Sequence, residues 1–484
     1  MELFRTLANE AGMLAIIEKA IDNHVFSLRW VLLGWASCAA LLPFSTNCGG
    51  PVYEVDAPSV DAPSDEGDDV APGDTTAVNK DTCNVSCINT LCTQEIFDVE
   101  RVPISPLDPE SKYGSGHPVL SADGRFVAFG VSGSMFGGET KGNEVIVYDR
   151  QDDAFEVASV STSGDPANDS SWGPSISNDG RFVAFATRAS NLVEDDTNGI
   201  VDAFVRDRWN ETTVRVSVSS SGAEGTLSPR NFELEDPTLS PDGRYVVFTS
   251  WANGLVPGDQ NDDGDVFLHD IQSGETVWLS SAPLGEEPDS WSYAPTVSKD
   301  ASYVAFTSWA TNLAPGGLLS EADMFIWENG QEGLQLVDLL GDLSGTISDG
   351  KSHITTDGRL LVLHSWLPTM RGLIVYDRNK GMGSLLFDES DKQMQTIGTR
   401  QLAVSGDARY VLFSGNREPD GSAIFVADRL CNTLAMLRLS TDDEDSEFAP
   451  RFFSLSSNGQ WIAFSSKDPL NKNTDILVGR LNGP

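Results

Sequence analysis

The stretch SADGRFVAF, residues 121–129, recurs along the chain as SNDGRFVAF from Ser177 and SPDGRYVVF from Ser240. Further copies, which read SKDASYVAF, TTDGRLLVL, SGDARYVLF and SSNGQWIAF, begin at Ser298, Thr355, Ser405 and Ser456. Successive copies lie 50–63 residues apart. A nearly constant period of this size indicates one supersecondary unit that is stacked many times. The repeat therefore predicts the fold, and the function has to be argued largely from it.

The repeats share one pattern, which contains four strands where it is complete. A short apolar strand leads to the Ser, the Asp-Gly pair makes a tight turn, and a second apolar strand follows. After a polar loop, a third strand ends in Asp-Arg, as in VIVYDR from Val145. A fourth strand, TTVRVSVS from Thr212, alternates polar and apolar residues and should have one solvent-exposed face. This pattern predicts an all-β, seven-bladed β-propeller of antiparallel blades over residues 83–484, with a sandwich or solenoid of hairpins as the alternative.

The two ends of the repeat region predict how the ring closes. The last repeat reaches its third strand, DILVGR from Asp475, and no fourth-strand pattern follows it. An extra strand, residues 96–105, precedes the first repeat, and its ERVPIS segment resembles the VRVSVS of a fourth strand at Val214. We expect this N-terminal strand to complete the last blade, because closure removes free sheet edges that promote aggregation.

The SxDGRxxxF core, together with the strand that ends in Asp-Arg, resembles the TolB-type, WD-like propeller repeats of bacterial envelope proteins. The resemblance covers residues 95 to 482, which is most of the chain. It implies a propeller, but it implies little about function, since propellers serve as binders, scaffolds and enzymes. The chain departs from TolB in one respect: a tether, and no N-terminal α/β domain, precedes the repeats.

The N-terminal segment, residues 1–48, predicts export. It contains an apolar run, residues 30–44, of the length of a signal-peptide core, too short to span a bilayer comfortably. Cys48 and two glycines follow, as at the acylation site of a bacterial lipoprotein. Residues 49–82 are rich in Asp, Pro, Ala and Ser and predict a disordered linker. We expect a periplasmic or surface protein held at the membrane only by a lipid; a cytoplasmic amphipathic helix near the start is the competing interpretation.

Four further cysteines, Cys83, Cys87, Cys92 and Cys431, are an even number that suits two disulfides. Cys431 is expected at a turn of blade 6, and Cys92 just before the closing strand. We therefore expect Cys431 to pair with one of the other three, preferably Cys92, and the remaining two to pair with each other. A metal site is the alternative, although the spacing matches no zinc motif that we recognise and no His lies nearby.

The formal net charge of −40 limits the class of partner. It excludes a protein that binds the phosphate backbone of nucleic acids. It fits a soluble, monomeric protein outside the cytoplasm, or one that holds cations. The expected partners are an envelope protein, a peptide or a polysaccharide.

Two acidic loops between second and third strands have spacing that suits calcium. In blade 3 the loop carries Asp259, Asn261, Asp263 and Asp265, with Gly264 for a sharp turn, and in blade 2 the corresponding residues are Asp196, Asn198 and Asp202. Oxygen ligands at alternate positions around a glycine are what Ca²⁺ prefers. The distal Glu and the flanking helices of an EF-hand are absent from the sequence. The alternative is that these residues form Asx turns that cap the third strand.

Three consecutive blades end their second strand in Ser-Trp, at Trp251, Trp309 and Trp366. These residues should lie on the face that carries the loops after the second and fourth strands. A row of indoles there would suit stacking on a sugar or a peptide. The alternative is that each ring packs between neighbouring blades. We expect at least two of the three rings to be partly exposed.

Catalysis finds little support in the sequence. The four histidines that follow the signal region occupy different repeat positions, and no G-x-S-x-G or H-E-x-x-H motif is present. The repeated Asp of the turn is interpreted as structural. We therefore expect a non-catalytic binding or scaffold protein of the cell envelope. A carbohydrate-active hydrolase or lyase with carboxylates in the propeller channel is the alternative.

Overall fold

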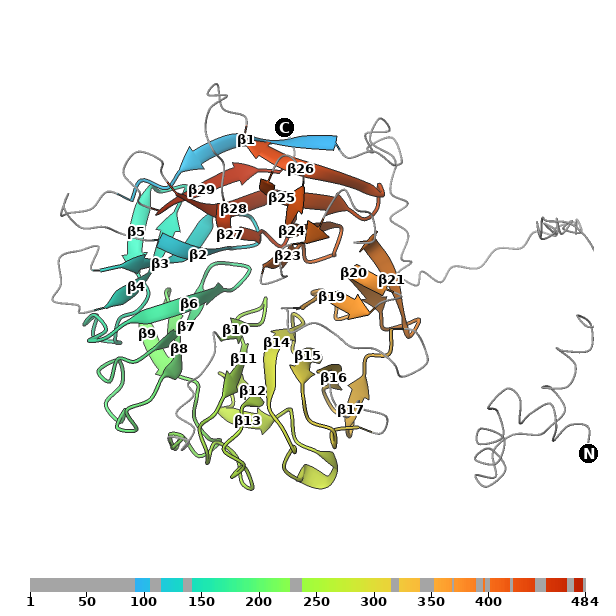
Figure 1. Cartoon of the computed structure of the whole chain (residues 1–484). Helices are drawn as coiled ribbons and strands as arrows, with labels where there is room; N and C mark the ends of the chain where they lie inside the picture. Colours follow the sequence, from blue (N-terminus) through green and yellow to red (C-terminus); the bar gives the residue numbers. More distant parts are fainter. Residues whose placement is uncertain are drawn as a thin grey trace, which may run out of the picture. The chain divides into compact units, whose positions relative to one another are not determined.

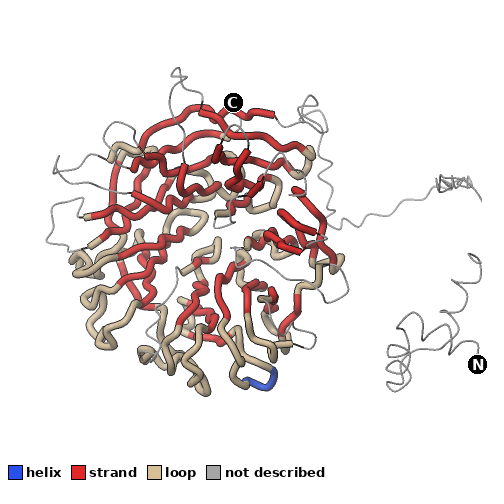
Figure 2. Tube along the Cα trace, in the orientation of Figure 1, coloured by secondary structure: helices blue, strands red, loops and turns tan. Residues whose placement is uncertain are grey.

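The structure is a computed structural model, and the repeats lie in a compact unit that spans Val78–Pro484. The residues that it describes are 92–104, 115–133, 142–226, 237–314, 322–339, 352–367, 370–388, 395–396, 401–417, 421–439, 450–467 and 474–481. Within these ranges the regular structure is almost entirely β-strand, and the one helical element is the 3-10 turn η3 (Pro283–Gly285), as Figure 2 shows.

The described strands form the seven blades of a propeller (Figure 1). Blade 1 contains β2 (Ser115–Leu120), β3 (Phe126–Ser132), β4 (Asn143–Asp149) and β5 (Ala154–Val157). Blade 2 contains β6 (Ser171–Ile176), β7 (Phe182–Thr187), β8 (Asp202–Asp207) and β9 (Thr212–Arg215). Blade 3 contains β10 (Thr238–Leu239), β11 (Tyr245–Ser250), β12 (Asp265–Asp270) and β13 (Glu275–Trp278).

The remaining blades follow the same antiparallel order. Blade 4 contains β14 (Ser292–Val297), β15 (Tyr303–Ser308), β16 (Asp323–Glu328) and β17 (Leu334–Leu336). Blade 5 contains β18 (His353–Ile354), β19 (Leu360–Leu367), β20 (Met370–Asp377) and β21 (Met382–Asp388). Blade 6 has a split first strand, β22 (Gln395–Thr396) and β23 (Leu402–Val404), beside β24 (Tyr410–Arg417), β25 (Gly421–Asp428) and β26 (Thr433–Leu439). Blade 7 contains β27 (Pro450–Leu455), β28 (Trp461–Lys467), β29 (Thr474–Arg480) and β1 (Cys92–Arg101).

The N-terminal strand closes the ring, which confirms the prediction. The second half of β1 pairs antiparallel with β29, with Arg101 opposite Leu477, and so supplies the fourth strand of blade 7. The first half has a partner that was not predicted: it runs parallel to β26 of blade 6, with Ile96 opposite Leu439. Ile96 is buried in the core between blades 6 and 7, and Val102 in the core between blades 7 and 1. One strand therefore joins three blades.

The apolar second and third strands of the blades form the core. The motif ends in a buried Phe, at most 1% exposed, in six blades: Phe129, Phe185, Phe248, Phe306, Phe413 and Phe464. In four blades this ring stacks on a Phe of the third strand, with centroids 5.7–6.1 Å apart. Each core cluster combines residues of two neighbouring blades, so every blade stabilises the next.

The repeated Ser-x-Asp-Gly-Arg segment makes the turn between the first and second strands. In blade 2 the hydroxyl of Ser177 donates to the carboxylate of Asp179 at 2.6 Å, which also accepts the backbone N–H of Arg181 at 2.9 Å. The guanidinium of Arg181 then donates two hydrogen bonds, of 2.9 and 2.6 Å, to Asp207 at the end of the third strand. Equivalent contacts recur in blades 1, 3 and 6, which gives the repeated Asp a structural role.

The same turns join neighbouring blades. Gly180 has a φ of +75°, and a Cβ at this position would stand 2.1 Å from the ring of Phe126 in blade 1. Glycine is therefore required both by the backbone conformation and by the close approach of the ring. Arg208, at the end of the third strand, donates to the carbonyl of Gly180 and lies 4.5 Å from the centroid of the same Phe126 ring. The repeat motif of blade 2 thus contacts the preceding blade through Gly180 and Arg208.

Backbone hydrogen bonds also link the turns of successive blades. Ala122 in blade 1 donates to the carbonyl of Asn178 in blade 2 at 2.9 Å, and Asn178 donates to Pro241 in blade 3 at 2.9 Å. Similar bonds run from blade 4 through to blade 7, and one from Asn458 returns to Ala122 at 3.3 Å. Pro241 has no N–H, so blade 3 cannot donate the corresponding bond to blade 4. The turns therefore form a nearly continuous ring on one face of the propeller.

Candidate functional site

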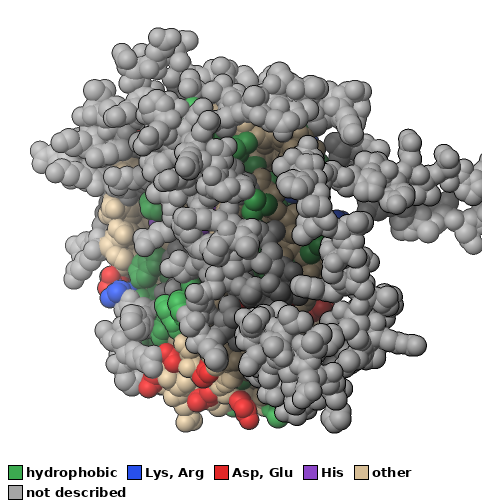
Figure 3. All heavy atoms as spheres, turned by 45° about the vertical axis from the view of Figure 1, so that its right-hand side comes forward, with side chains coloured by type: hydrophobic (Ala, Val, Ile, Leu, Met, Phe, Trp, Pro, Cys, Tyr) green, Lys and Arg blue, Asp and Glu red, His purple; other side chains and the backbone are tan. Residues whose placement is uncertain are grey.

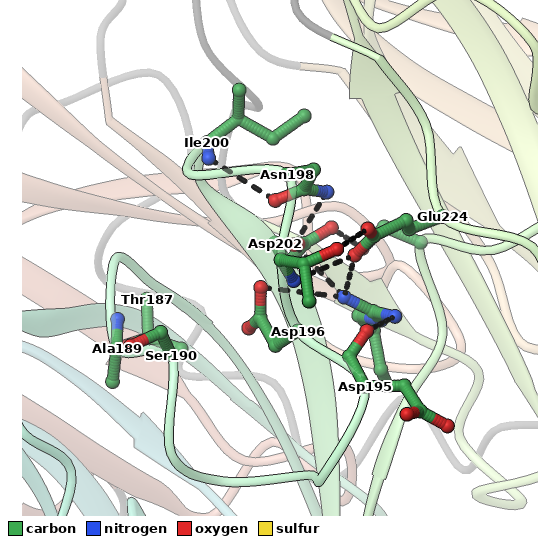
Figure 4. Close-up of polar contacts among 12 residues, drawn as sticks. Thr187, Ala189, Ser190, Asp195, Asp196, Asn198, Ile200, Asp202 and Glu224 are labelled. Carbon is green, nitrogen blue, oxygen red and sulfur yellow. Dashed lines mark hydrogen bonds and ion pairs between the residues drawn. The ribbon is translucent and has the colours of Figure 1, made fainter.

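The connections after the second and fourth strands lie on the face opposite to the turns, because the strands of a blade alternate in direction. We call this the loop face. In blade 2 it carries three carboxylates around one guanidinium. Nη1 of Arg215, at the end of β9, lies 3.4 Å from Asp196, 3.5 Å from Asp202 and 2.9 Å from Glu224. Figure 4 shows the three acidic side chains converging, and the side chains of Arg215 and both aspartates are at most 6% exposed.

Hydrogen bonds hold this cluster in place. The amide of Asn198 donates to Asp202 at 3.0 Å, and its carbonyl oxygen accepts a loop N–H. The hydroxyl and the backbone N–H of Thr197 donate to Glu224. These bonds, with the neighbouring guanidinium, lower the pKa of Glu224 to about 2. Burial, followed by the charge of Asp202, raises the pKa of Asp196 to about 6. The cluster is therefore a buried set of charges that its own arginine compensates.

Blade 3 repeats this arrangement with one substitution. Asp259, Asp265 and Glu287 stand where blade 2 has its three carboxylates, each 63 positions later in the chain. Trp278 stands 63 positions after Arg215, at the end of β13. An indole thus replaces the guanidinium, and its N–H donates to a neighbouring serine hydroxyl at 3.1 Å. None of the described Lys or Arg residues forms an ion pair with the three carboxylates of blade 3.

The contacts in blade 3 match their counterparts in blade 2. Ser280 donates to Asp265 at 2.6 Å, and the backbone N–H of Gln260 donates to Glu287 at 2.7 Å. Asp265 is fully buried and Asp259 is only 4% exposed. The carboxylate of Asp259 has no hydrogen bond or ion pair with any described residue. Burial, followed by the charges of Asp265 and Glu287, raises the pKa of Asp259 to about 7, and burial raises that of Asp265 to about 6.

The two predicted calcium loops therefore differ. In blade 2 a guanidinium already stands among the carboxylates, so we withdraw Asp196, Asn198 and Asp202 as calcium ligands and keep the prediction for blade 3 alone. There the carbonyl oxygen of Asn261 accepts the N–H of Asp263 at 2.9 Å, which is an Asx turn. Within the described ranges, no group of three or more His, Cys, Asp or Glu side chains stands in an arrangement that could hold a metal ion.

The predicted row of three tryptophans is not a continuous exposed platform. Trp251 is buried, with 7% of its surface exposed, and it packs on the backbone of Gly264: a Cβ there would stand 2.6 Å from the indole. Trp309 is 37% exposed. The side chain of Trp366 lies outside the described residues, so the expectation of two exposed rings stays a prediction.

An exposed aromatic neighbour of Trp309 was not singled out from the sequence. The backbone N–H of Trp309 donates to the carbonyl of Trp291 at 3.0 Å, next to the pairing of Ser292 with Ser308. Residues opposite each other on antiparallel strands have side chains on the same side of the sheet. Trp291 is 38% exposed, and its ring stacks on Tyr293 with centroids 5.1 Å apart. Trp291 and Trp309, which we call the tryptophan pair, thus lie at the loop face of blade 4.

Blades 3 and 4 also form a cavity, and exposed acidic groups occur in this part of the chain. The cavity, of about 340 Å³, lies between blades 3 and 4, and its lining includes Trp278, Leu284 and Trp327. Leu284, in η3, is 99% exposed. In Figure 3 acidic side chains gather at the lower edge of the molecule. Glu286 and Glu287, in the connection after β13, are exposed.

The register of β1 bears on the predicted disulfides. Cys431 is disulfide-bonded. Cys92 lies opposite Ala435 in parallel register, four positions along the chain from Cys431. Cys83, Cys87 and the side chain of Cys92 lie outside the described residues, so the pairing of Cys431, preferably with Cys92, stays a prediction.

Cys48, the signal-like run and the acidic linker lie outside the described residues. In the part of the chain that is described, no helix has the length and apolar character needed to cross a membrane. Export and lipid attachment therefore stay predictions.

No protein-family model and no curated protein matches the chain. Among solved structures it is similar to the β-propeller domain of the Trilobed protease from Pyrococcus furiosus, with 13% identity, a TM-score of 0.48, and coverage of 77% of this chain and 99% of that chain. It is similar to TolB from Acinetobacter baumannii with 13% identity, a TM-score of 0.38, and coverage of 76% and 80%. A prolyl endopeptidase gives 11% identity and a TM-score of 0.49, and this chain covers 50% of its length. The structural neighbours thus include TolB proteins and peptidase propellers, and at this level of similarity no activity follows from them.

Proposed function

We propose that this protein is an exported, lipid-anchored binding protein of the bacterial cell envelope, and that its binding surface is the tryptophan pair of blade 4. The partner in this proposal is a cationic protein or peptide segment. The exposure of Trp291 and Trp309 side by side on the loop face is the observation that carries it.

The tryptophan pair has the properties of a binding anchor. Large aromatic residues supply much of the binding energy in protein interfaces when they are held rigidly. Trp291 stacks on the buried Tyr293, and a backbone hydrogen bond ties Trp309 to Trp291. The stacked ring of Trp291 therefore has less side-chain freedom to lose on binding, which lowers the entropic cost of association. Both rings still expose more than a third of their surface.

The charge of the surroundings favours a cationic partner. Asp289 lies two residues before Trp291 and is exposed, as is Glu287. Lys and Arg side chains bind over the face of an indole, and a chain with a net charge of −40 attracts such partners over a distance. A neutral polysaccharide would stack on the same rings but would gain nothing from this charge.

The test is capture of envelope proteins by the purified full chain. We expect the double variant Trp291→Ala, Trp309→Ala to lose its partner, with affinity reduced about 30-fold or more, because truncation of an anchor residue costs about 2 kcal/mol or more. Trp209→Ala is the matched control, since Trp209 is 61% exposed on blade 2 at the opposite face. Capture should also weaken when NaCl is raised.

Equal capture by the double variant and the parent would contradict this assignment, as would binding of neutral polysaccharide alone.

The lipid anchor is tested separately in cells. Cys48→Ala should move the protein from the membrane fraction to the soluble fraction without changing its folding, because Cys48 lies ahead of the compact unit Val78–Pro484. Retention of Cys48→Ala in the membrane fraction would argue against a lipid on this residue.

A further inference from the structure

We propose that blade 3 binds a calcium ion at the carboxylates of Asp259, Asp265 and Glu287, in the place that a guanidinium takes in blade 2. The inference does not depend on the tryptophan pair, although Glu287 is also one of the exposed carboxylates that favour a cationic partner. It rests on a comparison of two equivalent sites within one chain.

Blade 2 shows what such a site requires. Three carboxylates, two of them buried, come within 3.5 Å of a single nitrogen atom of Arg215. The backbone carbonyl of Asp195 accepts a further hydrogen bond from the same guanidinium at 2.9 Å. The loop therefore gathers four groups of oxygen atoms around a positive charge, and the chain itself supplies that charge. Buried carboxylates without such a charge would be costly.

Blade 3 retains the carboxylates but not the arginine. Trp278 contributes an uncharged indole, and its N–H is bonded to Ser280. Asp259 is only 4% exposed. Its carboxylate feels the negative charges of Asp265 and Glu287 and has no hydrogen-bond donor among the described residues. A buried carboxylate that has no partner among the described residues and feels the charges of two further carboxylates points to a cation from solution as the missing partner.

The chemistry of the site favours a monatomic cation. The donors are oxygen atoms only, as Ca²⁺ prefers, and a single ion can take the position of one guanidinium nitrogen without the volume of a whole side chain. The blade 2 oxygen atoms lie 2.9–3.5 Å from that nitrogen, whereas Ca²⁺ ligands lie about 2.3–2.6 Å from the ion. The carboxylates must therefore move inward by up to ~1 Å. Glu287 is exposed and can move inward if its hydrogen bond from the backbone N–H of Gln260 lengthens.

The two blades supply matched variants for the test. Isothermal titration of the full chain with CaCl₂ should give one site in the parent. Trp278→Arg places the blade 2 guanidinium in blade 3 and should abolish calcium binding, and Asp259→Asn should do the same. Asp196→Asn, the equivalent change in blade 2, should leave one site. The reverse exchange, Arg215→Trp, should raise the number of sites to two.

Thermal unfolding gives a second readout. Saturating Ca²⁺ should raise the melting temperature of the parent by about 3 °C and leave that of Trp278→Arg unchanged. Absence of calcium binding at millimolar concentration overturns the proposal, and so does binding that survives in both Trp278→Arg and Asp259→Asn. Tighter binding of Mg²⁺ than of Ca²⁺ overturns the assignment to calcium. A rise in melting temperature that guanidinium ion produces and Ca²⁺ does not overturns it as well.

Discussion

Deletion of residues 93–106 is expected to make the propeller aggregate or to remove most of its stability. The deletion takes away the antiparallel partner of β29 and the parallel partner of β26, so two sheet edges become free at once. It also removes Ile96 and Val102, which are at most 1% exposed. Burying each of these side chains contributes about 1.5–3 kcal/mol, so the loss is ~5 kcal/mol even before the strand pairing is counted. That is comparable to the whole stability of many proteins, ~5–15 kcal/mol.

The measurement is the soluble yield and the denaturant midpoint of the variant beside the parent. A deletion of equal length in the acidic linker, residues 55–68, is the control, and it should leave both values unchanged. Both deletions keep all six cysteines. If the chain without its closing strand is as soluble and as stable as the control, the ring does not depend on β1.

The propeller could be predicted because its determinants repeat. The turn residues, the buried Phe and the Asp-Arg at the end of the third strand act within one blade or on the next, so each copy carries the information for its own contacts. The closing strand could be recognised because it resembles a fourth strand. Its parallel pairing with β26 could not, because the other strand pairs among the described residues are all antiparallel and the repeat has no pattern for a parallel one.

The candidate sites could be predicted only in part, because each combines loops that lie apart in the sequence. Asp259 and Asp265 belong to one acidic loop, but Glu287 joins them from the connection after β13, and the residue at the end of the fourth strand decides whether a guanidinium stands among the carboxylates. The 63-residue offset between the blades contains this information, and it becomes evident only when the contacts identify which positions matter. Likewise, the Ser-Trp pattern identified strand ends but could not distinguish a buried ring from an exposed one.

Trp251 and Trp309 occupy equivalent positions, and their substitution by Ala should have very different effects. Trp251→Ala is expected to lower the free energy of unfolding by ~3–5 kcal/mol, the usual cost of removing a buried aromatic ring. Trp309→Ala should change it by less than about 1 kcal/mol, because the ring is 37% exposed and little packing is lost. Chemical denaturation of both variants and the parent is the measurement.

The reason lies in what the buried ring supports. The indole of Trp251 packs directly on Gly264, whose carbonyl accepts the backbone N–H of Ser292 at 2.7 Å. Gly264 precedes Asp265 of the acidic cluster, and Ser292 follows Trp291 of the tryptophan pair. Trp251 thus holds the junction between the two candidate sites rather than forming part of either surface. Equal stability of the two variants would show that this packing contributes little and would reopen Trp251 as a surface residue.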